Sequence, residues 1–338
     1  MSSPLSDLAI PVVAAPMAGG PTTPELVAAA AHAGGIGFLA AGYKTPDALA
    51  AQIAAVRSVP FGVNLFAPNP VPVDVAAFRD YANTIRADAD RYGVDVTGDP
   101  VEDDDHWAGK IDVLLADPVP MVSFTFGLPD RAVLAALHKA GSVLVQTVTS
   151  ADEAKLAADA GVDMLAVQAS VAGGHSGTLT PQVLPPPTPL VELIAQVRAA
   201  VSLPIVAAGG LGTSADITAV LRAGAVAAVV GTVLLRTDES GASAVVQTAL
   251  ADPARTETVV TRAFSGRPAR GLRNDFIDRY DAVAPAGYPA LHHLTSPLRK
   301  AATAAGDPEL VNLWAGTGHR HATAGPAAAV LTGLAAGL

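Results

Sequence analysis

One histidine in the middle of the chain lies in a loop made almost entirely of small residues. Residues 167–178 read Val-Gln-Ala-Ser-Val-Ala-Gly-Gly-His-Ser-Gly-Thr, and the apolar run 164–168 is typical of a buried strand. The glycines around His175 let the backbone approach a ligand closely, because they carry no Cβ atom. An imidazole can act as a base or as a cation near neutral pH. If the chain is an enzyme, we therefore expect His175 to be its catalytic residue.

Glycines also follow two later apolar runs. Gly209 and Gly210 come after one run, and Gly231 and Thr232 come after the next. Backbone N–H groups of glycine and a threonine hydroxyl can donate hydrogen bonds to phosphate oxygens. Each glycine could instead serve only to turn the chain. Two such loops at successive strand ends favour a phosphate site, because barrel enzymes often bind phosphate there.

Three side-chain amides, those of Asn64, Gln146 and Gln168, stand in or at the end of other apolar runs. A polar side chain in an apolar strand either bonds to the backbone in the core or faces an open end of the sheet. Three amides at one face suit a ring rich in donors and acceptors, such as a flavin. Met17, which follows Pro16 at the end of the first run, could rest against such a ring or belong to the core.

Eight short apolar runs alternate with alanine-rich helical segments along the chain. The runs are continuous rather than alternating, as in strands that are buried on both faces of a parallel sheet. Eight such units predict an α/β fold of the (β/α)8 TIM barrel type. The alternative, a doubly wound open sheet, is disfavoured because no Gly-x-Gly-x-x-Gly follows the first run. The predicted strands are 12–15, 37–41, 61–66, 121–124, 142–147, 164–168, 205–208 and 227–230.

Two regions are too long for this repeat. Residues 73–116 form an insertion after the third strand, with a predicted helix over 75–91. In the tail we predict helices at about 297–305 and 309–314, and poor order in the Ala/Gly-rich segment 323–338. We therefore expect a barrel domain over residues 1–245 and a C-terminal helical cover and tail over residues 246–338.

Composition excludes several classes of function. The 338 residues contain no cysteine, which excludes disulfides, thiolate zinc sites and flavin barrels with a cysteine nucleophile. A net charge of −10 with no Lys/Arg stripe argues against nucleic acid as a partner. The apolar stretches are too short and interrupted to span a membrane, and no signal peptide is indicated. We expect a cytoplasmic protein. We interpret the acidic run 102–105, beside His106, as a solvated surface and expect no metal.

Taken together, these segments resemble the nitronate monooxygenase family, formerly called 2-nitropropane dioxygenases. The resemblance covers nearly the whole chain, and its tail resembles the bacterial class I branch. The Gly-Gly-His loop is shared with FMN-dependent enoyl-ACP reductases. The segments that carry the resemblance are 15–17, 62–65, 168, 172–177, 208–210 and 231–232, with 288–289, 294–299 and 313–316 in the tail.

The resemblance implies FMN across the C-terminal mouth of the barrel, with His175 on the substrate side. Ser176, Tyr288 and Lys300 are further candidates for contact with the substrate. Family members often carry a glutamate where this chain has Val171, and a large or charged residue in place of Ser176. The residues expected to bind the cofactor are Ala15, Pro16, Met17, Asn64, Gln146, Gln168, Gly173, Gly174, Gly209, Gly210, Val230, Gly231 and Thr232.

The activity that the resemblance implies is an FMN-dependent oxidation of alkyl nitronates, such as propionate 3-nitronate, by O₂. The products would be a carbonyl compound and nitrite. His175 could remove the α-proton of a neutral nitroalkane as a base, or attract the nitronate as a cation. Two alternatives stay open: an FMN-dependent NAD(P)H reductase of the enoyl-ACP or quinone type, and a flavin-binding protein without turnover. We expect only small-molecule partners and a monomer or homodimer.

Overall fold

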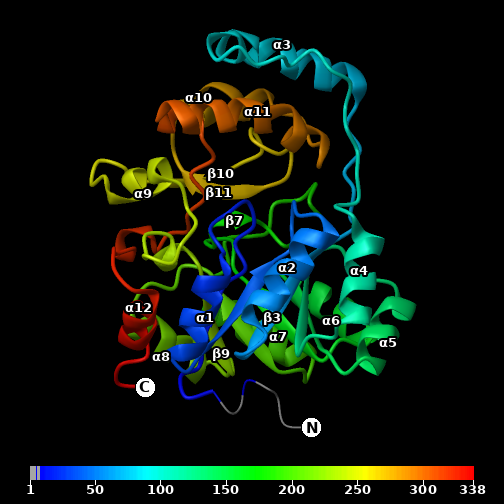
Figure 1. The fold of residues 1–338 in the computed structure, drawn as a ribbon, viewed down its shortest axis with the longest axis vertical. Coiled ribbons are helices and arrows are strands. Elements are labelled where there is room, and N and C mark those ends of the chain that lie inside the picture. Colours follow the sequence, from blue (N-terminus) through cyan, green and yellow to red (C-terminus); the bar gives the residue numbers. More distant parts are fainter. Residues whose placement is uncertain (1–4, 6–7) are drawn as a thin grey trace.

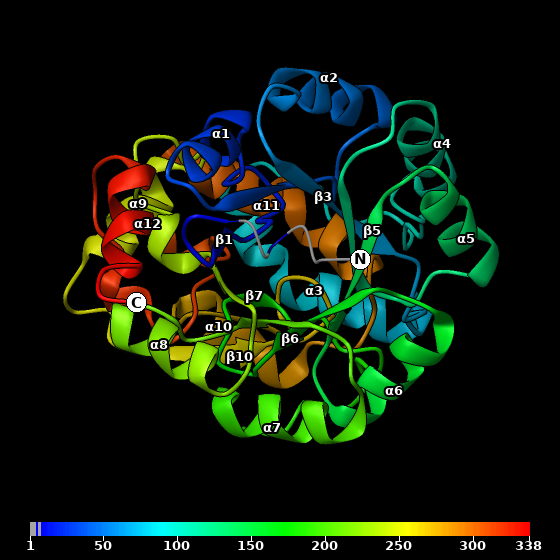
Figure 2. The same ribbon diagram turned by 90° about the horizontal axis from the view of Figure 1, so that it is seen from below.

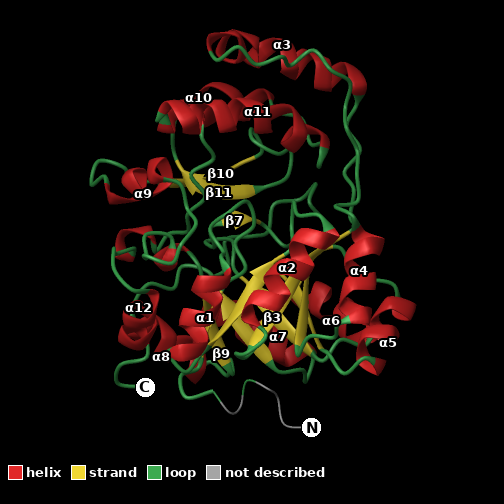
Figure 3. Cartoon of the chain, viewed as in Figure 1, coloured by secondary structure: helices red, strands yellow, loops and turns green. Residues whose placement is uncertain are grey.

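Eight parallel strands form a closed barrel, seen along its axis in Figure 2 and as the lower set of strands in Figure 3. The computed structural model describes Leu5 and residues 8–338. All eight predicted strands are present, each within two residues of its predicted ends, so the predicted (β/α)8 fold is confirmed. The strands of the barrel are β1 (Val12–Ala14), β2 (Ile36–Ala40), β3 (Phe61–Ala67), β4 (Met121–Phe126), β5 (Val143–Val148), β6 (Met164–Gln168), β8 (Ile205–Ala208) and β9 (Ala227–Val230).

The helices around the barrel begin at residues that suit a helix N-terminus. The hydroxyls of Thr23, Thr45, Ser150 and Thr213 each accept a hydrogen bond from the first turn of the helix that follows. Alternate strand residues, such as Phe38 and Met121, fill the inside of the barrel. The surrounding helices are α1 (Pro24–His32), α2 (Pro46–Val56), α4 (Trp107–Ala116), α5 (Arg131–Lys139), α6 (Ala151–Ala160), α7 (Leu190–Ala200) and α8 (Ser214–Arg222).

A cover built mainly from the second half of the chain stands over the C-terminal mouth of the barrel (Figure 1). Its small antiparallel sheet has the order β10-β11-β7, and its middle strand pairs Ala269 with His175. The His175 loop is therefore a strand of the cover as well as a loop of the barrel. The cover consists of β7 (Gly174–His175), α9 (Ala244–Ala251), β10 (Thr258–Thr261), β11 (Ala269–Leu272), α10 (Asp275–Tyr280) and α11 (Ala290–Ala305). Four short 3-10 turns accompany these elements: η1 (Thr232–Leu234), η2 (Asp281–Val283), η3 (Pro308–Leu310) and η4 (His319–His321).

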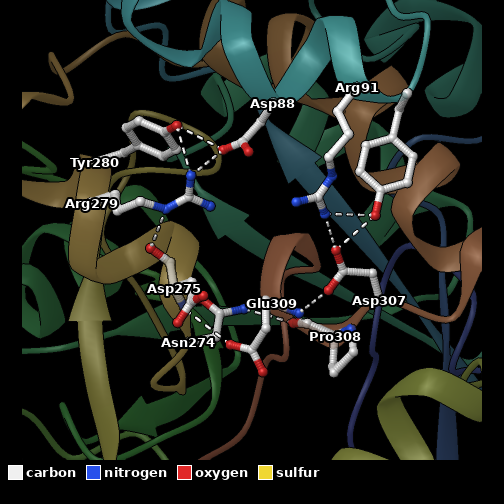
Figure 4. A network of polar contacts seen from close by, with 10 residues as sticks. Asp88, Arg91, Asn274, Asp275, Arg279, Tyr280, Asp307, Pro308 and Glu309 are labelled. Carbon is white, nitrogen blue, oxygen red and sulfur yellow. Dashed lines mark hydrogen bonds and ion pairs between the residues drawn. The ribbon is translucent and has the colours of Figure 1, made fainter.

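The predicted insertion helix is present as α3 (Val75–Arg91) and lies on top of the cover (Figure 1). Figure 4 shows the polar contacts that fasten it. Near its end, the carboxylate of Asp88 pairs with Arg279 at 2.7 Å and accepts a hydrogen bond from the hydroxyl of Tyr280 at 2.7 Å. One turn later, Arg91 pairs with Asp307. The hydroxyl of Tyr81 also donates to the carbonyl of Ala263 at 2.6 Å, so the insertion is joined to the cover along the length of α3.

Two predictions about the remaining segments are wrong. The predicted helix 309–314 is only the single turn η3, and the chain then runs extended beside β11, where Gly271 forms a β-bridge with Trp314. Residues 323–338 contain α12 (Ala327–Leu334), whose buried Leu331 packs in the core that the barrel helices share. The acidic run 102–105 is solvated as predicted at its first three residues, and only Asp105 turns inward, where it pairs with the buried Lys110 at 2.6 Å.

Within the described residues, no helix has the length and apolar character needed to cross a membrane. The same part of the chain contains no cluster of three or more His, Cys, Asp or Glu side chains arranged to hold a metal ion.

Candidate functional site

A cavity of about 740 Å³ lies between the mouth of the barrel and the cover. This volume is within the usual range for small-molecule sites. No Asp or Glu occurs among the described residues that line it, whereas Arg299 and Lys300 do. Most residues predicted for the site meet here: Ala15, Pro16, Met17, Asn64, Gln168, Gly173, Gly174, His175, Gly209, Gly210, Val230, Gly231, Thr232 and Lys300.

Three residues predicted for the site do not line this cavity. Gln146 is fully buried, and its Nε2 donates to the carbonyl oxygens of Gly127 and Thr147 at 3.1 Å each. Ser176 lines a separate hollow of about 120 Å³ on the other side of the His175 loop. Tyr288 is buried behind His175, with 5.8 Å between the two ring centroids. Gln146 thus bonds to the backbone in the core, which is one of the two alternatives that the sequence allowed for an amide in an apolar strand.

One side of the cavity is made of backbone. Gly210, Gly231 and Gly318 line it, and their N–H groups donate to no described residue. The hydroxyl of Thr232 accepts a hydrogen bond from the N–H of Gly316 at 3.0 Å, which leaves the hydroxyl proton available to a ligand. These donors form a cradle that could hold an anion such as a phosphate group.

Gly173 fits this side only because it has no side chain. A Cβ atom at Gly173 would lie within 3.0 Å of backbone atoms of Ala315 and Gly316. The tail segment 316–318 therefore packs directly against the Gly-Gly-His loop. Sequence reasoning missed this segment as part of the site, although its Gly-Thr-Gly sequence resembles the two other glycine loops.

The two remaining predicted amides differ in what they leave for a ligand. Nδ2 of Asn64 donates to the hydroxyls of Ser123 and Thr125 at 2.9 and 3.1 Å, while Oδ1 accepts no hydrogen bond from a described residue. Asn64 therefore offers an acceptor to the cavity. Gln168 uses both ends of its amide on the loop after β6, accepting from the N–H of Gly177 at 2.7 Å and donating to the carbonyl of His175 at 3.2 Å. Gln168 thus fixes the shape of that loop.

His175 lies in a cage of aromatic rings in the wall of the cavity. Its ring centroid is 5.6 Å from that of Phe126 and 5.5 Å from that of Trp314. Its Nε2 is 2.8 Å from the hydroxyl oxygen of Ser265. Burial, assisted by the positive charges of Arg267 and Arg299, lowers the pKa of His175 from 6.5 to about 3. The imidazole is therefore neutral at physiological pH.

Arg267 is a fully buried cation next to this histidine. Its guanidinium lies over the ring of Phe126, 4.0 Å from the centroid, and donates to the carbonyl oxygens of Ser176 and Thr178. No carboxylate pairs with it in the described part of the chain. Burial lowers its pKa to about 10, so it remains charged at neutral pH. Arg267 thus adds a positive charge behind His175 that has no carboxylate in direct contact, although the buried Glu153 acts on it from a distance.

Arg299 places a second cation in the wall of the cavity itself. It donates to Asn312 Oδ1 at 2.9 Å, to Thr295 Oγ1 at 3.1 Å and to the carbonyl of His292 at 3.1 Å. The ring of His292 stacks on Tyr43 at 4.1 Å. Burial lowers the pKa of Arg299 to about 10. The side chain of its neighbour Lys300 forms no hydrogen bond or ion pair with a described residue, so its ammonium group is available to a ligand.

Sequence reasoning missed Ser265, Arg267 and Arg299. All three belong to the cover: the pairing of β11 with β7 brings Ser265 and Arg267 to the histidine, and α11 carries Arg299. The segment 264–271 reads Phe-Ser-Gly-Arg-Pro-Ala-Arg-Gly. Glycines and arginines close together in a chain with few charged residues could have indicated that this segment belongs to the site.

Comparison with known proteins assigns the chain to a family. The family model for nitronate monooxygenase matches residues 2–337. A probable nitronate monooxygenase of Staphylococcus aureus (strain MRSA252) is 34% identical over 331 residues, which covers 96% of this chain and 93% of the relative.

Solved structures show the same similarity. A nitroalkane oxidase from Streptomyces ansochromogenes superposes with a TM-score of 0.92 at 46% identity, covering 98% of this chain and 96% of that one. FabK from Thermotoga maritima superposes with a TM-score of 0.76 at 24% identity, covering 98% and 93% of the two chains, and this likeness concerns the fold alone.

Proposed function

Because this chain belongs to the nitronate monooxygenase family, enzymes that oxidise nitroalkanes or nitronates, we propose that it is an FMN-dependent oxidase of alkyl nitronates. The proposed reaction uses O₂ and yields a carbonyl compound and nitrite. The likeness to FabK concerns the fold alone, so it favours no particular reaction.

The observation that carries this proposal is the charge of the cavity. The chain has a net charge of −10, yet the cavity contains Arg299 and Lys300 and no carboxylate among its described lining residues. Arg267 adds a buried positive charge behind His175. In a partly dry site, such charges attract an anion far more strongly than they would in water. A nitronate is an anion, and so is a flavin phosphate.

The residues present fit FMN at two places. The N–H groups of Gly210, Gly231 and Gly318, with the hydroxyl of Thr232, would hold the phosphate. Oδ1 of Asn64 would accept a hydrogen bond from an N–H at the edge of the ring. When bound, FMN would supply the capacity to take electrons from the substrate and pass them to O₂.

His175 would act as a base only toward a neutral nitroalkane. A neutral imidazole can accept the proton on the carbon next to the nitro group. A nitronate has already lost that proton, so its oxidation does not need this step. The low pKa of His175 argues against a resident imidazolium that would attract the nitronate. We assign that attraction to Arg299 and Lys300 instead.

The lysine also suits a substrate with a second negative charge. Lys300 is unpaired in the wall of the cavity, and an ammonium group can bind the carboxylate of propionate 3-nitronate. Ser176 and Tyr288, the other two residues expected on the substrate side, do not reach the cavity lining.

The proposal is tested on the purified protein with added FMN. We expect a flavin absorbance spectrum, O₂ uptake with propionate 3-nitronate, and nitrite release. A protein that gains no flavin absorbance would overturn the choice of cofactor. A protein that binds FMN, is bleached rapidly by NAD(P)H and leaves the nitronate untouched would overturn the reaction.

A further inference from the structure

Ser265 is the one residue hydrogen-bonded to the imidazole of His175 in the described part of the chain. It lies in the tight turn between β10 and β11, where its N–H donates to the carbonyl of Arg262 at 3.2 Å. Its hydroxyl oxygen is 2.8 Å from Nε2 of His175. The same oxygen is 3.2 Å from the carbonyl oxygen of Arg267 and 3.4 Å from its N–H. Ser265 therefore has three partners within reach and a single proton to donate.

The Arg267 carbonyl decides where that proton goes. Arg267 is fully buried, and among the described residues Ser265 is the only donor to its carbonyl oxygen. If Ser265 gave its proton to His175, this carbonyl would be buried without any hydrogen bond, which folded proteins avoid. The serine hydroxyl therefore donates to Arg267 and accepts from the histidine. A hydrogen bond in that direction requires a proton on Nε2.

We propose that Ser265 is a positioning residue that holds neutral His175 in its Nε2–H tautomer, so that Nδ1 is the basic atom presented to the substrate. This inference rests on the proposed function for its chemistry, although the tautomer itself does not.

The surroundings of Nδ1 agree with this assignment. Nδ1 has no hydrogen-bond partner among the described residues. Although it has no partner, Nδ1 is not fully buried, so it is open to the cavity that the ring lines. A base needs an exposed lone pair, and the imidazole tautomer with the proton on Nε2 provides it at Nδ1.

The proton transfer balances without any other reactant. The C–H bond next to the nitro group breaks, its proton moves to Nδ1, and the electron pair remains on the substrate as the nitronate. The product imidazolium carries protons on both nitrogens and keeps its hydrogen bond from Nε2 to Ser265. No bond to Ser265 has to break during the step.

The tautomer is tested directly by nitrogen NMR of the protein labelled with ¹⁵N-histidine. The His175 signal, assigned by its loss in His175→Asn, should show a protonated Nε2 and an unprotonated Nδ1 near neutral pH. A proton on Nδ1, or an equal mixture of both forms, would overturn the proposal. This result is independent of whether the protein oxidises nitronates.

Kinetics of Ser265→Ala test the role in the reaction. We expect turnover of a neutral nitroalkane to fall roughly 10- to 100-fold, as when partners that orient a functional histidine are removed. Oxidation of preformed propionate 3-nitronate should change less than about threefold, because no proton is removed in that reaction. Equal losses on both substrates, or no loss on either, would overturn the positioning role. Wild-type protein inactive on both substrates would instead overturn the proposed function.

A matched control separates this effect from a general loss of stability. Ser142 is also buried and also donates to a backbone carbonyl, that of Val119, at 2.7 Å. It does not line the cavity. Ser142→Ala should therefore lower stability about as much as Ser265→Ala, while both substrates are turned over at the wild-type rate. If Ser265→Ala does not fold, the NMR result on the wild type still decides the proposal.

Discussion

The two sides of the cavity are built in different ways. The side near Gly210, Gly231 and Gly318 presents backbone N–H groups, and its shape depends on the absence of side chains. The side near His175 consists of side chains, with Ser265 and Phe126 reaching it from different elements. A backbone cradle can bind any phosphate of suitable size. The side chains around His175 instead determine the protonation of the imidazole and the charge that a substrate meets.

This difference separates binding from chemistry. Changes on the histidine side should alter the reaction and leave the proposed flavin bound. Changes on the glycine side should release the flavin. The predictions below test that separation.

The largest effect is expected for His175→Asn. Asparagine keeps a polar group of similar size but cannot act as a base, so turnover of a neutral nitroalkane should fall about 10²- to 10⁴-fold. O₂ uptake and nitrite release measure this loss. The flavin absorbance should be unchanged, and its disappearance would contradict the separation of the two sides.

Gly173→Ala should disrupt the glycine side of the cavity and weaken the binding of FMN. The new Cβ would meet backbone atoms of Ala315 and Gly316, which cannot move without displacing the cradle. We expect the affinity for FMN to fall at least about tenfold, equivalent to roughly 1.4 kcal/mol, in a fluorescence titration. Gly333→Ala is the control, because a Cβ there meets nothing within 4 Å. Equal affinities in the two variants would show that the tail contact does not matter.

Arg267→Met should change the protonation of His175. Methionine fills much of the same space without charge, and removing that positive charge should raise the pKa of the imidazole above about 3. The pKa should stay below 6.5, because burial is the larger cause of the shift. An NMR titration measures it. Arg267→Lys, which keeps the charge, should move the pKa less, and an identical shift in both variants would contradict an electrostatic origin.

A smaller effect is expected on stability in acid. The pKa of His175 is lower in the folded state than the ordinary value of 6.5, so the unfolded chain binds more protons as the pH falls. The free energy of unfolding should therefore decrease as the pH falls from 6.5 toward 3. Urea midpoints at about pH 7 and about pH 5 measure the decrease. It should be shallower in His175→Asn, and the same slope in both proteins would contradict this origin.

The sequence was most informative where local rules act. The eight strands are buried on both faces and therefore read as continuous apolar runs. The glycine loops and the insertion helix α3 were also predicted within a few residues, because turn chemistry and helical periodicity are local signals. The predicted cradle residues Gly210, Gly231 and Thr232 all line the cavity.

The cover was predicted poorly because long-range packing decides it. Residues 311–314 are extended because β11 offers them backbone partners, as in the hydrogen bond from the N–H of Leu272 to the carbonyl of Leu313. The segment 327–334 is helical because Leu331 buries its side chain in the core shared with the barrel. Neither partner is visible in the local sequence. The same reason hid Ser265, which is 90 residues from His175 along the chain.

The contact between Gly173 and the tail also has a consequence for synthesis on the ribosome. All eight barrel strands are translated before residues 316–318, yet these residues complete the proposed phosphate cradle. Retention of the proposed FMN therefore requires a segment that is translated after every strand of the barrel. Loading of the proposed cofactor would be among the last events of maturation, and flavin retention would report whether a newly made chain has finished folding.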